Sequence, residues 1–260
     1  MFAFTVVASA VVGLAIGSFL NVVIYRVPAG RSIVTPGSAC PTCGTEIAPR
    51  DNIPVLSWML LRGRCRVCKA PISPRYPLIE GLTAVLFALV AARLGTSWSL
   101  PPELAFTGGL IALAAVDAER YLLPRAIVYP TAALVVIGLL VAAGETGHWS
   151  NFGKAAICGA AAFALFFAIN FVRPSWMGFG DVRLAGLMGL ALGWLGPWFL
   201  LVGFMAANLA GALVGVALMV LGRATRRTAL PYGVFLAGGS VLAILVGGPI
   251  IHWYSSHFVH

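Results

Sequence analysis

The sequence has few charged residues and very few acidic ones. Only 10% of its 260 residues are charged, and eight Asp and Glu stand against seventeen Lys and Arg. Hydrophobic residues make up 60% of the chain. Because a soluble globular domain carries about 25% charged residues, this composition excludes an ordinary soluble domain and indicates a polytopic membrane protein.

Several common catalytic motifs are also missing. The sequence contains no Ser, His and Asp arrangement, no Gly-rich phosphate loop and no HExxH motif. Serine hydrolysis, nucleotide-driven chemistry and zincin chemistry therefore lack support. The four histidines have no partners at useful spacing and are interpreted as surface residues: His148, His252, His257 and His260.

Long apolar stretches dominate what remains. They are unbroken, whereas the strands of a membrane barrel alternate polar and apolar residues, so the stretches predict helices. A helix of about 20 residues crosses a hydrocarbon core of roughly 30 Å. We therefore predict an all-α polytopic membrane protein with about eight transmembrane helices. The predicted spans begin at Phe2, Pro77, Leu100, Ala126, Phe152, Leu184, Trp198 and Pro231.

The distribution of polar residues divides the chain into three predicted parts. Residues 1–25 form the first span, which lacks a basic n-region and a small-residue cleavage site, so we predict that it is retained and that there is no signal peptide. Residues 26–76 are rich in Arg, Pro and Cys and predict a small cytoplasmic domain. Residues 77–260 then form a seven-span membrane core.

The basic residues give an orientation. If the N-terminus lies outside, fifteen of the seventeen Lys and Arg residues fall on the cytoplasmic side, and only Arg93 and Lys154 lie outside. An excess of Lys and Arg in cytoplasmic loops is the usual pattern in membrane proteins. It accounts for the net charge of +9, so no nucleic-acid partner is predicted. Arg223, Arg226 and Arg227 are interpreted as anchors among anionic headgroups.

Two acids lie at the edges of apolar stretches. Asp117 ends the run LIALAAVD and Asp181 precedes RLAGLMG, and the predicted topology places both at the cytoplasmic face. An ionised carboxylate costs several kcal/mol at membrane depth, so the presence of two acids there indicates that they have a functional role. An aspartic protease requires at least a pair of acids in a shielded site. A proton-coupled transporter or a purely structural pair remains an alternative.

Two glycines precede the second acid. Gly178 and Gly180 in GFGD remove side-chain bulk and permit backbone conformations closed to other residues. A substrate strand can then approach Asp181 closely. Glycine is also common in membrane helices simply because it permits close packing, so the pattern alone does not decide between the two interpretations.

Four cysteines form two CxxC pairs in the polar domain. Cys40, Cys43, Cys65 and Cys68 have the spacing of a tetrahedral zinc site. Four thiolates leave no open position for catalysis, so we predict a structural zinc ion. A redox role or spare thiols are the alternatives. A further hypothesis treats this domain as a docking module anchored by the membrane part, but eight spans exceed what anchoring requires. Cys158 is interpreted as a packing residue.

The order of several sequence blocks resembles the prepilin peptidases, the type IV leader peptidases of bacterial type IV pilus and type II secretion systems. A single GxGD motif would be weak support, whereas six blocks in order cover nearly the whole chain. The blocks are GSFLNVVIYRVP from Gly17, CPTCGTEI from Cys40, NIPVLSWMLLRGRCRVCKAPISPRYPLIE from Asn52, DAERYLLP from Asp117, GFGDVRL from Gly178, and LPYGVFLAGG from Leu230.

The resemblance implies a membrane aspartic endopeptidase of the bacterial inner membrane. Such enzymes cut the leader from prepilins and pseudopilins at the cytoplasmic face, and their two catalytic aspartates fall on Asp117 and Asp181 here. Many members also methylate the new N-terminus with S-adenosylmethionine, and the four-Cys zinc segment is typical of those bifunctional forms. The chain departs from the family pattern at Arg125, where an aspartate is usual, and at Arg183, where a lysine is usual. Arg183 keeps the charge but alters its geometry, so substrate preference is expected to differ.

Overall fold

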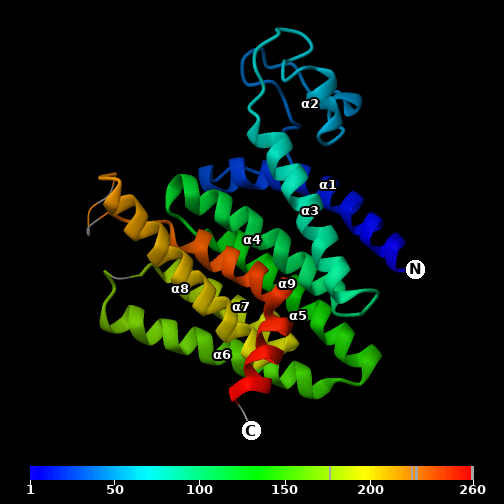
Figure 1. Ribbon diagram of the computed structural model, residues 1–260. Coiled ribbons are helices and arrows are strands. Elements are labelled where there is room, and N and C mark those ends of the chain that lie inside the picture. The colour runs from blue at the N-terminus through cyan, green and yellow to red at the C-terminus, as the bar shows by residue number, and fades with distance from the viewer. Residues whose placement is uncertain (176, 224, 226–227, 259–260) are drawn as a thin grey trace. The chain divides into compact units, whose positions relative to one another are not determined.

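The protein is helical throughout the part of the chain that the structure describes. The computed structural model describes residues 1–175, 177–223, 225 and 228–258, so Arg226, Arg227 and His260 lie outside the described residues. No strand occurs in these ranges (Figure 1). The helices are α1 (Phe2–Arg26), α2 (Leu56–Leu60), α3 (Arg75–Leu94), α4 (Leu100–Arg120), α5 (Arg125–Thr146), α6 (Trp149–Val172), α7 (Phe179–Leu195), α8 (Pro197–Val220) and α9 (Tyr232–Phe258), with short 3-10 turns at Val27–Ala29 and Pro49–Asp51.

The predicted fold class is confirmed. Seven helices of the described chain, namely α1, α3, α4, α5, α6, α8 and α9, are long and apolar enough to cross a membrane. The eighth long helix, α7, has 17 residues and is mostly buried. Its start differs from the prediction, because α7 begins at Phe179 rather than at Leu184. Asp181 therefore belongs to the first turn of a helix and not to the loop before it.

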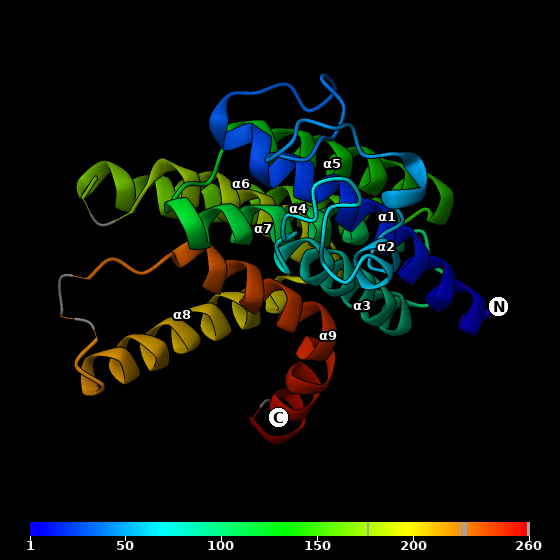
Figure 2. The same cartoon turned by 90° about the horizontal axis from the view of Figure 1, so that it is seen from above.

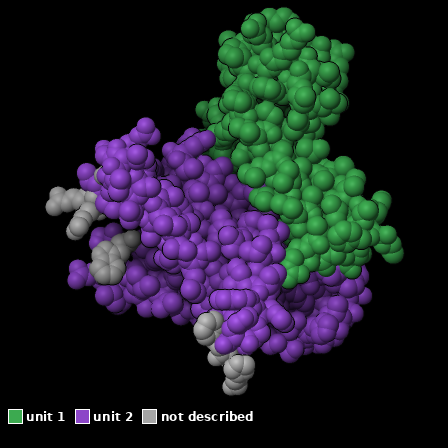
Figure 3. Space-filling view, viewed as in Figure 1, with its two compact units in different colours: residues 1–96 green, residues 97–260 purple. Residues whose placement is uncertain are grey.

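The chain divides into two compact units, Met1–Thr96 and Ser97–His260 (Figure 3). The first unit contains α1, the cysteine-rich segment and α3. α3 packs against α1, which lies before the polar segment in the chain. The division into a first span, a polar domain and a membrane core of residues 77–260 stays a prediction. The limits of the cysteine-rich domain at residues 26 and 76 remain a prediction.

Two glycines bring α1 and α3 into close contact. A Cβ atom at Gly13 would lie 2.7 Å from the Ala84 Cα, and one at Gly17 would lie 2.7 Å from the Glu80 Cα. The pair is spaced as GxxxG, which permits close approach of helix backbones in membranes. Two helices joined only through the polar segment thus form one unit.

We expect Gly17→Ala to destabilise the first unit. The added methyl group would overlap backbone of α3, and overpacking of this kind costs about 1–3 kcal/mol. Gly81→Ala is the matched control, since a Cβ there meets no atom within 4 Å and alanine is the better helix former. Thermal melting of the detergent-solubilised protein checks the prediction. Equal melting temperatures for the two variants would contradict it.

In the second unit α7 is the central element. It packs against α4, α5, α6, α8 and α9, and its buried residues run from Val182 to Trp194. Figure 2 shows that α9 bends along its length, and Pro249 lies inside this helix, where it removes a backbone hydrogen bond. The outer helix α8 exposes a stripe at four-residue spacing: Leu201, Met205, Leu209 and Leu213. Such a stripe is suited to contact with lipid.

Candidate active site and cysteine cluster

Asp117 lies near the C-terminal end of α4, in the last turn before the helix stops. Its side chain is 5% exposed, and its Oδ2 atom has no hydrogen-bond partner among the described residues. The helix ends because Tyr121 adopts a left-handed conformation with φ 54° while its N–H donates to the Asp117 carbonyl oxygen at 2.8 Å. The turn therefore stops the helix directly after the carboxylate and leaves that group buried at the helix end.

Asp181 lies in the first turn of α7. The Gly178 N–H donates to Asp181 Oδ2 at 3.2 Å, which caps the helix. The N-terminus of a helix favours negative charge nearby. Gly178 is the N-cap residue with extended backbone, φ −74° and ψ 151°. The GFGD sequence thus supplies both the cap and the acid in a single turn.

The two carboxyl groups are close enough to interact electrostatically. Leu123, in the loop after Asp117, shows how they are brought together. A Cβ at Gly180 would lie 2.7 Å from Leu123 Cβ, and one at Gly233 would lie 2.8 Å from Leu123 Cδ2. The end of α4 and the starts of α7 and α9 therefore converge around one leucine side chain.

The start of α9 lies against Asp117 and shares a cavity with Asp181. A Cβ at Gly233 would lie 2.9 Å from Asp117 Oδ2. The preceding residue, Tyr232, lines a cavity of about 240 Å3 together with Asp181, Ile169 and Met177. The Tyr232 hydroxyl donates to Asn208 Oδ1 at 3.3 Å, which fixes the ring against α8. Sequence reasoning identified neither Tyr232 nor Gly233 as a site residue, although both lie in the LPYGVF block.

Arg183 lies two residues beyond Asp181 and is held by aromatic rings. Its guanidinium carbon is 4.6 Å from the Phe179 ring centroid and 5.7 Å from that of Tyr129. Its Nε atom is buried without a hydrogen-bond partner among the described residues. A planar guanidinium stacks on aromatic faces better than an ammonium does. This stacking is a physical reason for arginine rather than lysine at position 183.

We expect Gly233→Ala to impair the chemistry of this site. The new methyl group would displace the Asp117 carboxylate or Leu123, and a misplacement of about 1 Å can cost roughly 100-fold in rate. Gly238→Ala on the same helix is the control, because a Cβ there meets no atom within 4 Å. The rates of peptide cleavage by the two variants check this. A Gly233→Ala enzyme as active as Gly238→Ala would show that the contact does not matter.

The four cysteines of the first unit form one cluster. Cys40, Cys43, Cys65 and Cys68 each offer a sulfur atom, and these atoms all lie within 4.8 Å of one another. The cluster is built from two similar turns. In the first, the Cys40 N–H donates to the Thr45 carbonyl and the Gly44 N–H donates to the Cys40 carbonyl.

The second turn repeats this pattern 25 residues later. The Cys65 N–H donates to the Ala70 carbonyl, and the Lys69 N–H donates to the Cys65 carbonyl. Gly44 and Lys69 occupy the same position and both have left-handed backbone, with φ 70° and 60°. The repeat makes each CxxC pair present its two sulfur atoms from one tight turn.

The geometry of the cluster fits a metal ion. A tetrahedral zinc site with Zn–S bonds of about 2.3 Å separates its sulfurs by about 3.8 Å, and the Cys40 and Cys68 Sγ atoms are 3.7 Å apart. The hydrogen-bonded Thr45 side chain lowers the pKa of Cys43 to about 6, which favours the thiolate, the form that binds metals. The cluster can therefore bind a metal ion.

Comparisons with known proteins match both units. The family described as Bacterial Peptidase A24 N-terminal domain matches residues 11–94, and the Type IV leader peptidase family matches residues 104–248. The first match covers the unit with the cysteine cluster and the second covers the unit with Asp117 and Asp181. No solved structure matches the chain.

Three curated relatives match over nearly their whole length. A protein of Aeromonas hydrophila is 35% identical over 95% of this chain and 92% of its own length. A protein of Pseudomonas aeruginosa is 34% identical over 96% of this chain and 93% of its own. One of Bacillus subtilis is 35% identical over 93% and 94%. Each of these relatives is named prepilin leader peptidase/N-methyltransferase.

Proposed function

The chain belongs to the type IV leader peptidase family, and we propose from this that it is a membrane aspartic endopeptidase with N-methyltransferase activity. Its substrates are type IV prepilins and the pseudopilins of type II secretion, from which it removes the leader peptide. It then methylates the new N-terminus. Asp117 and Asp181 are the catalytic residues, and Gly178 and Gly180, which the sequence placed in a loop, are the N-cap and a first-turn residue of α7 beside Asp181.

One observation carries the peptidase part of the proposal. Asp117 and Asp181, which are 64 positions apart in the sequence, interact electrostatically where α4, α7 and α9 meet. A transporter that relays protons would be expected to hold its acids near the membrane midplane, beside broken helices. Here both acids lie at helix ends.

The pair hydrolyses the peptide bond without a covalent enzyme intermediate. Like charges held close together cannot easily both ionise, so the two carboxyl groups share one proton and titrate as a unit. The ionised carboxylate takes a proton from a water molecule as the water oxygen adds to the scissile carbonyl carbon. The protonated carboxyl donates to the carbonyl oxygen. Protonation of the leaving nitrogen then breaks the C–N bond and frees the new amine.

The two cofactors have separate roles. Zinc held by Cys40, Cys43, Cys65 and Cys68 stabilises the polar segment, because a short segment with little apolar core gains folding free energy from a metal. S-adenosylmethionine, when bound, would supply the methyl group: its C–S bond would break with the electron pair staying on sulfur, the freed amine nitrogen would gain the methyl group, and that nitrogen would release one proton to water.

The protein is a multi-pass bacterial membrane protein, and we place it in the inner membrane with the active site facing the cytoplasm. The basic residues support this orientation, since only Arg93 and Lys154 would then lie outside. No nucleic acid partner is needed to explain the net charge. The lipid bilayer and the prepilin substrates are the partners in this proposal.

A reaction with purified prepilin tests the whole proposal. The detergent-solubilised protein is mixed with prepilin, with and without S-adenosylmethionine, and the product is measured by mass spectrometry. We expect loss of the leader in both reactions and a further gain of one methyl group only with the donor. An uncut prepilin would contradict the peptidase proposal, whereas a cut but unmethylated product would contradict the methyltransferase part alone.

A further inference from the structure

The short helix α2 of the first unit exposes an apolar face. Leu56, Met59 and Leu60 are 48%, 63% and 74% exposed. They are spaced three and four positions apart, so they lie on one side of the helix. None of the three lines the cavity of about 1230 Å3 that the first unit contains. Large apolar side chains gathered on the outside of a polar segment indicate a contact surface.

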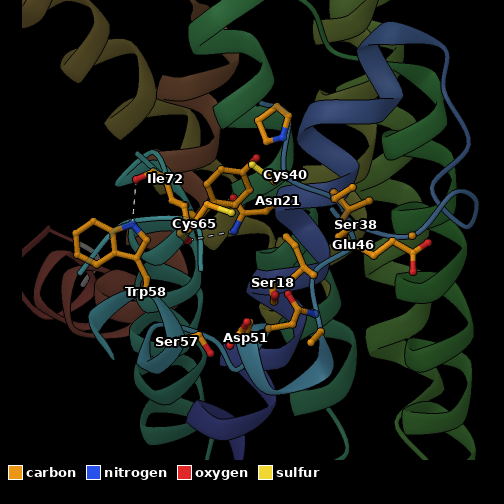
Figure 4. Close-up of a pocket in the computed structure, with 18 of the residues that line it drawn as sticks. Ser18, Asn21, Ser38, Cys40, Glu46, Asp51, Ser57, Trp58, Cys65 and Ile72 are labelled. Carbon is orange, nitrogen blue, oxygen red and sulfur yellow. Dashed lines mark hydrogen bonds between the residues drawn. The ribbon is translucent and has the colours of Figure 1, made fainter. Parts of the chain in front are cut away.

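The opposite side of α2 is fixed to the rest of the polar segment. The Trp58 Nε1 atom donates to the Ile72 carbonyl at 3.1 Å, and the Ser57 hydroxyl donates to the Arg50 carbonyl at 3.1 Å. Figure 4 shows Ser57 and Trp58 among the residues of the cavity wall, with a dashed line from the Trp58 ring to Ile72. A Cβ at Gly63 would lie 2.9 Å from Trp58 Cζ2, so the turn after α2 packs on the same ring. These contacts keep the apolar face turned outward.

A hydrogen bond holds the start of α2 beside a helix that can cross the membrane. The Val55 N–H, directly before α2, donates to the Glu80 side chain at 2.7 Å. Glu80 belongs to α3, which begins at Arg75 and is long and apolar enough to span a bilayer. The five residues between them correspond to about 7–8 Å along the helix axis, and side chains of a helix lean toward its N-terminus. α2 therefore starts between the levels of Arg75 and Glu80, where α3 enters the bilayer.

Basic residues directly follow the apolar face. In residues 26–76, eight Lys and Arg stand against two acids. Arg62 and Arg64 come after α2, are exposed, and have no ion pair among the described residues. The Arg62 N–H donates to the Met59 carbonyl at 3.0 Å, which keeps this turn next to the end of α2. An apolar face beside unpaired arginines matches an anionic lipid surface, whose acyl chains lie beneath phosphate groups.

We propose that α2 docks on the surface of the bilayer and binds anionic lipid. Leu56, Met59 and Leu60 lie in the boundary between headgroups and acyl chains, and Arg62 and Arg64 pair with the headgroups. Interfacial helices bury their apolar face about 5–10 Å into this boundary, which agrees with the level at which α2 is bonded to α3. The same level favours a lipid over a soluble protein as the partner. The docking requires neither the proposed reaction nor the proposed orientation.

Lipid photolabelling of the unaltered protein tests the contact directly. The full chain is placed in nanodiscs that contain a trace of phosphatidylcholine with a diazirine in its acyl chain, irradiated and digested with trypsin. Cleavage after Arg50 and Arg62 releases residues 51–62, a single peptide that contains the whole apolar face. We expect the label on this peptide. An unlabelled peptide beside labelled spans would overturn the proposal and leave the face to a second copy or another protein.

The lipid composition tests the role of the arginines. Discs of phosphatidylcholine alone are compared with discs that also contain phosphatidylglycerol. We expect about fivefold more label on the α2 peptide in the anionic discs, because each arginine near an anionic surface adds attraction of that order. The double variant Arg62→Gln and Arg64→Gln should lose this difference, whereas Lys69→Gln, at an exposed position in a cysteine turn, should retain it. Equal labelling of the unaltered protein in both discs would overturn the binding of anionic lipid.

A substitution in the apolar face tests the docking itself. Leu60→Glu should lower labelling of the α2 peptide about tenfold, because it removes a buried leucine from the lipid contact and adds a charge. Val67→Glu is the matched control, since Val67 is 62% exposed in the second cysteine turn and should label like the unaltered protein. Both variants should keep the melting temperature of the unaltered protein in detergent, where exposed positions tolerate substitution. Equal labelling of the two variants would overturn the assignment of the face.

Discussion

Asp117→Asn and Asp181→Asn are each expected to lower the rate of prepilin cleavage by about 100- to 10,000-fold. Neither amide can take a proton from water, and general acid–base catalysis contributes about 100- to 10,000-fold in enzymes. Because the two carboxyl groups act as one unit, the double variant should be no worse than either single variant. Cleavage is measured from the ratio of cut to uncut prepilin by mass spectrometry.

The control for these variants is Glu145→Gln, which removes an exposed acid at the end of α5 and should cleave at the original rate. The melting temperature of Asp117→Asn should stay near that of the unaltered protein or rise, because Asp117 is buried with one oxygen unpartnered among the described residues and an amide costs less to bury than a charge. Robust turnover by either aspartate variant would remove that residue from the mechanism.

The membrane-spanning helices could be predicted because each depends only on the hydrophobicity of one continuous segment. Each needs only about 20 apolar residues in succession, and the predicted starts at Phe2 and Leu100 agree with the observed helices. Leu184 was wrong as a helix start by five positions. The polar and glycine residues of GFGD look like a loop in a hydropathy pattern, yet Asp181 caps the helix by accepting the Gly178 N–H.

The surroundings of the candidate site were less predictable because they depend on packing between distant segments. Tyr232 and Gly233 carry no charge pattern that indicates a role, and their proximity to the two acids follows from the way α9 packs against α4 and α7. The packing of α3 against α1 likewise joins segments that are separated in the sequence by the polar segment. The Gly13 and Gly17 spacing was the available sequence signal for that contact.

The cysteine cluster gives the second large effect that we expect. Purified protein should contain about one zinc ion per chain, and Cys40→Ser or Cys65→Ser should reduce the zinc content close to that of a blank. Serine keeps the size of the side chain but replaces a thiolate by a hydroxyl, which is a far poorer zinc ligand at neutral pH. The zinc content of each purified variant is measured by elemental mass spectrometry.

Cys158→Ser is the matched control, because Cys158 is buried in α6 and belongs to the other unit. It should retain zinc fully. The two CxxC turns have the same hydrogen bonds and bring their sulfur atoms together in the cluster, so loss of the ion should also expose residues 26–76 to proteolysis while the helices stay protected. Unchanged zinc content in both Cys40→Ser and Cys65→Ser would refute the metal site, because each substitution removes a ligand from a different turn.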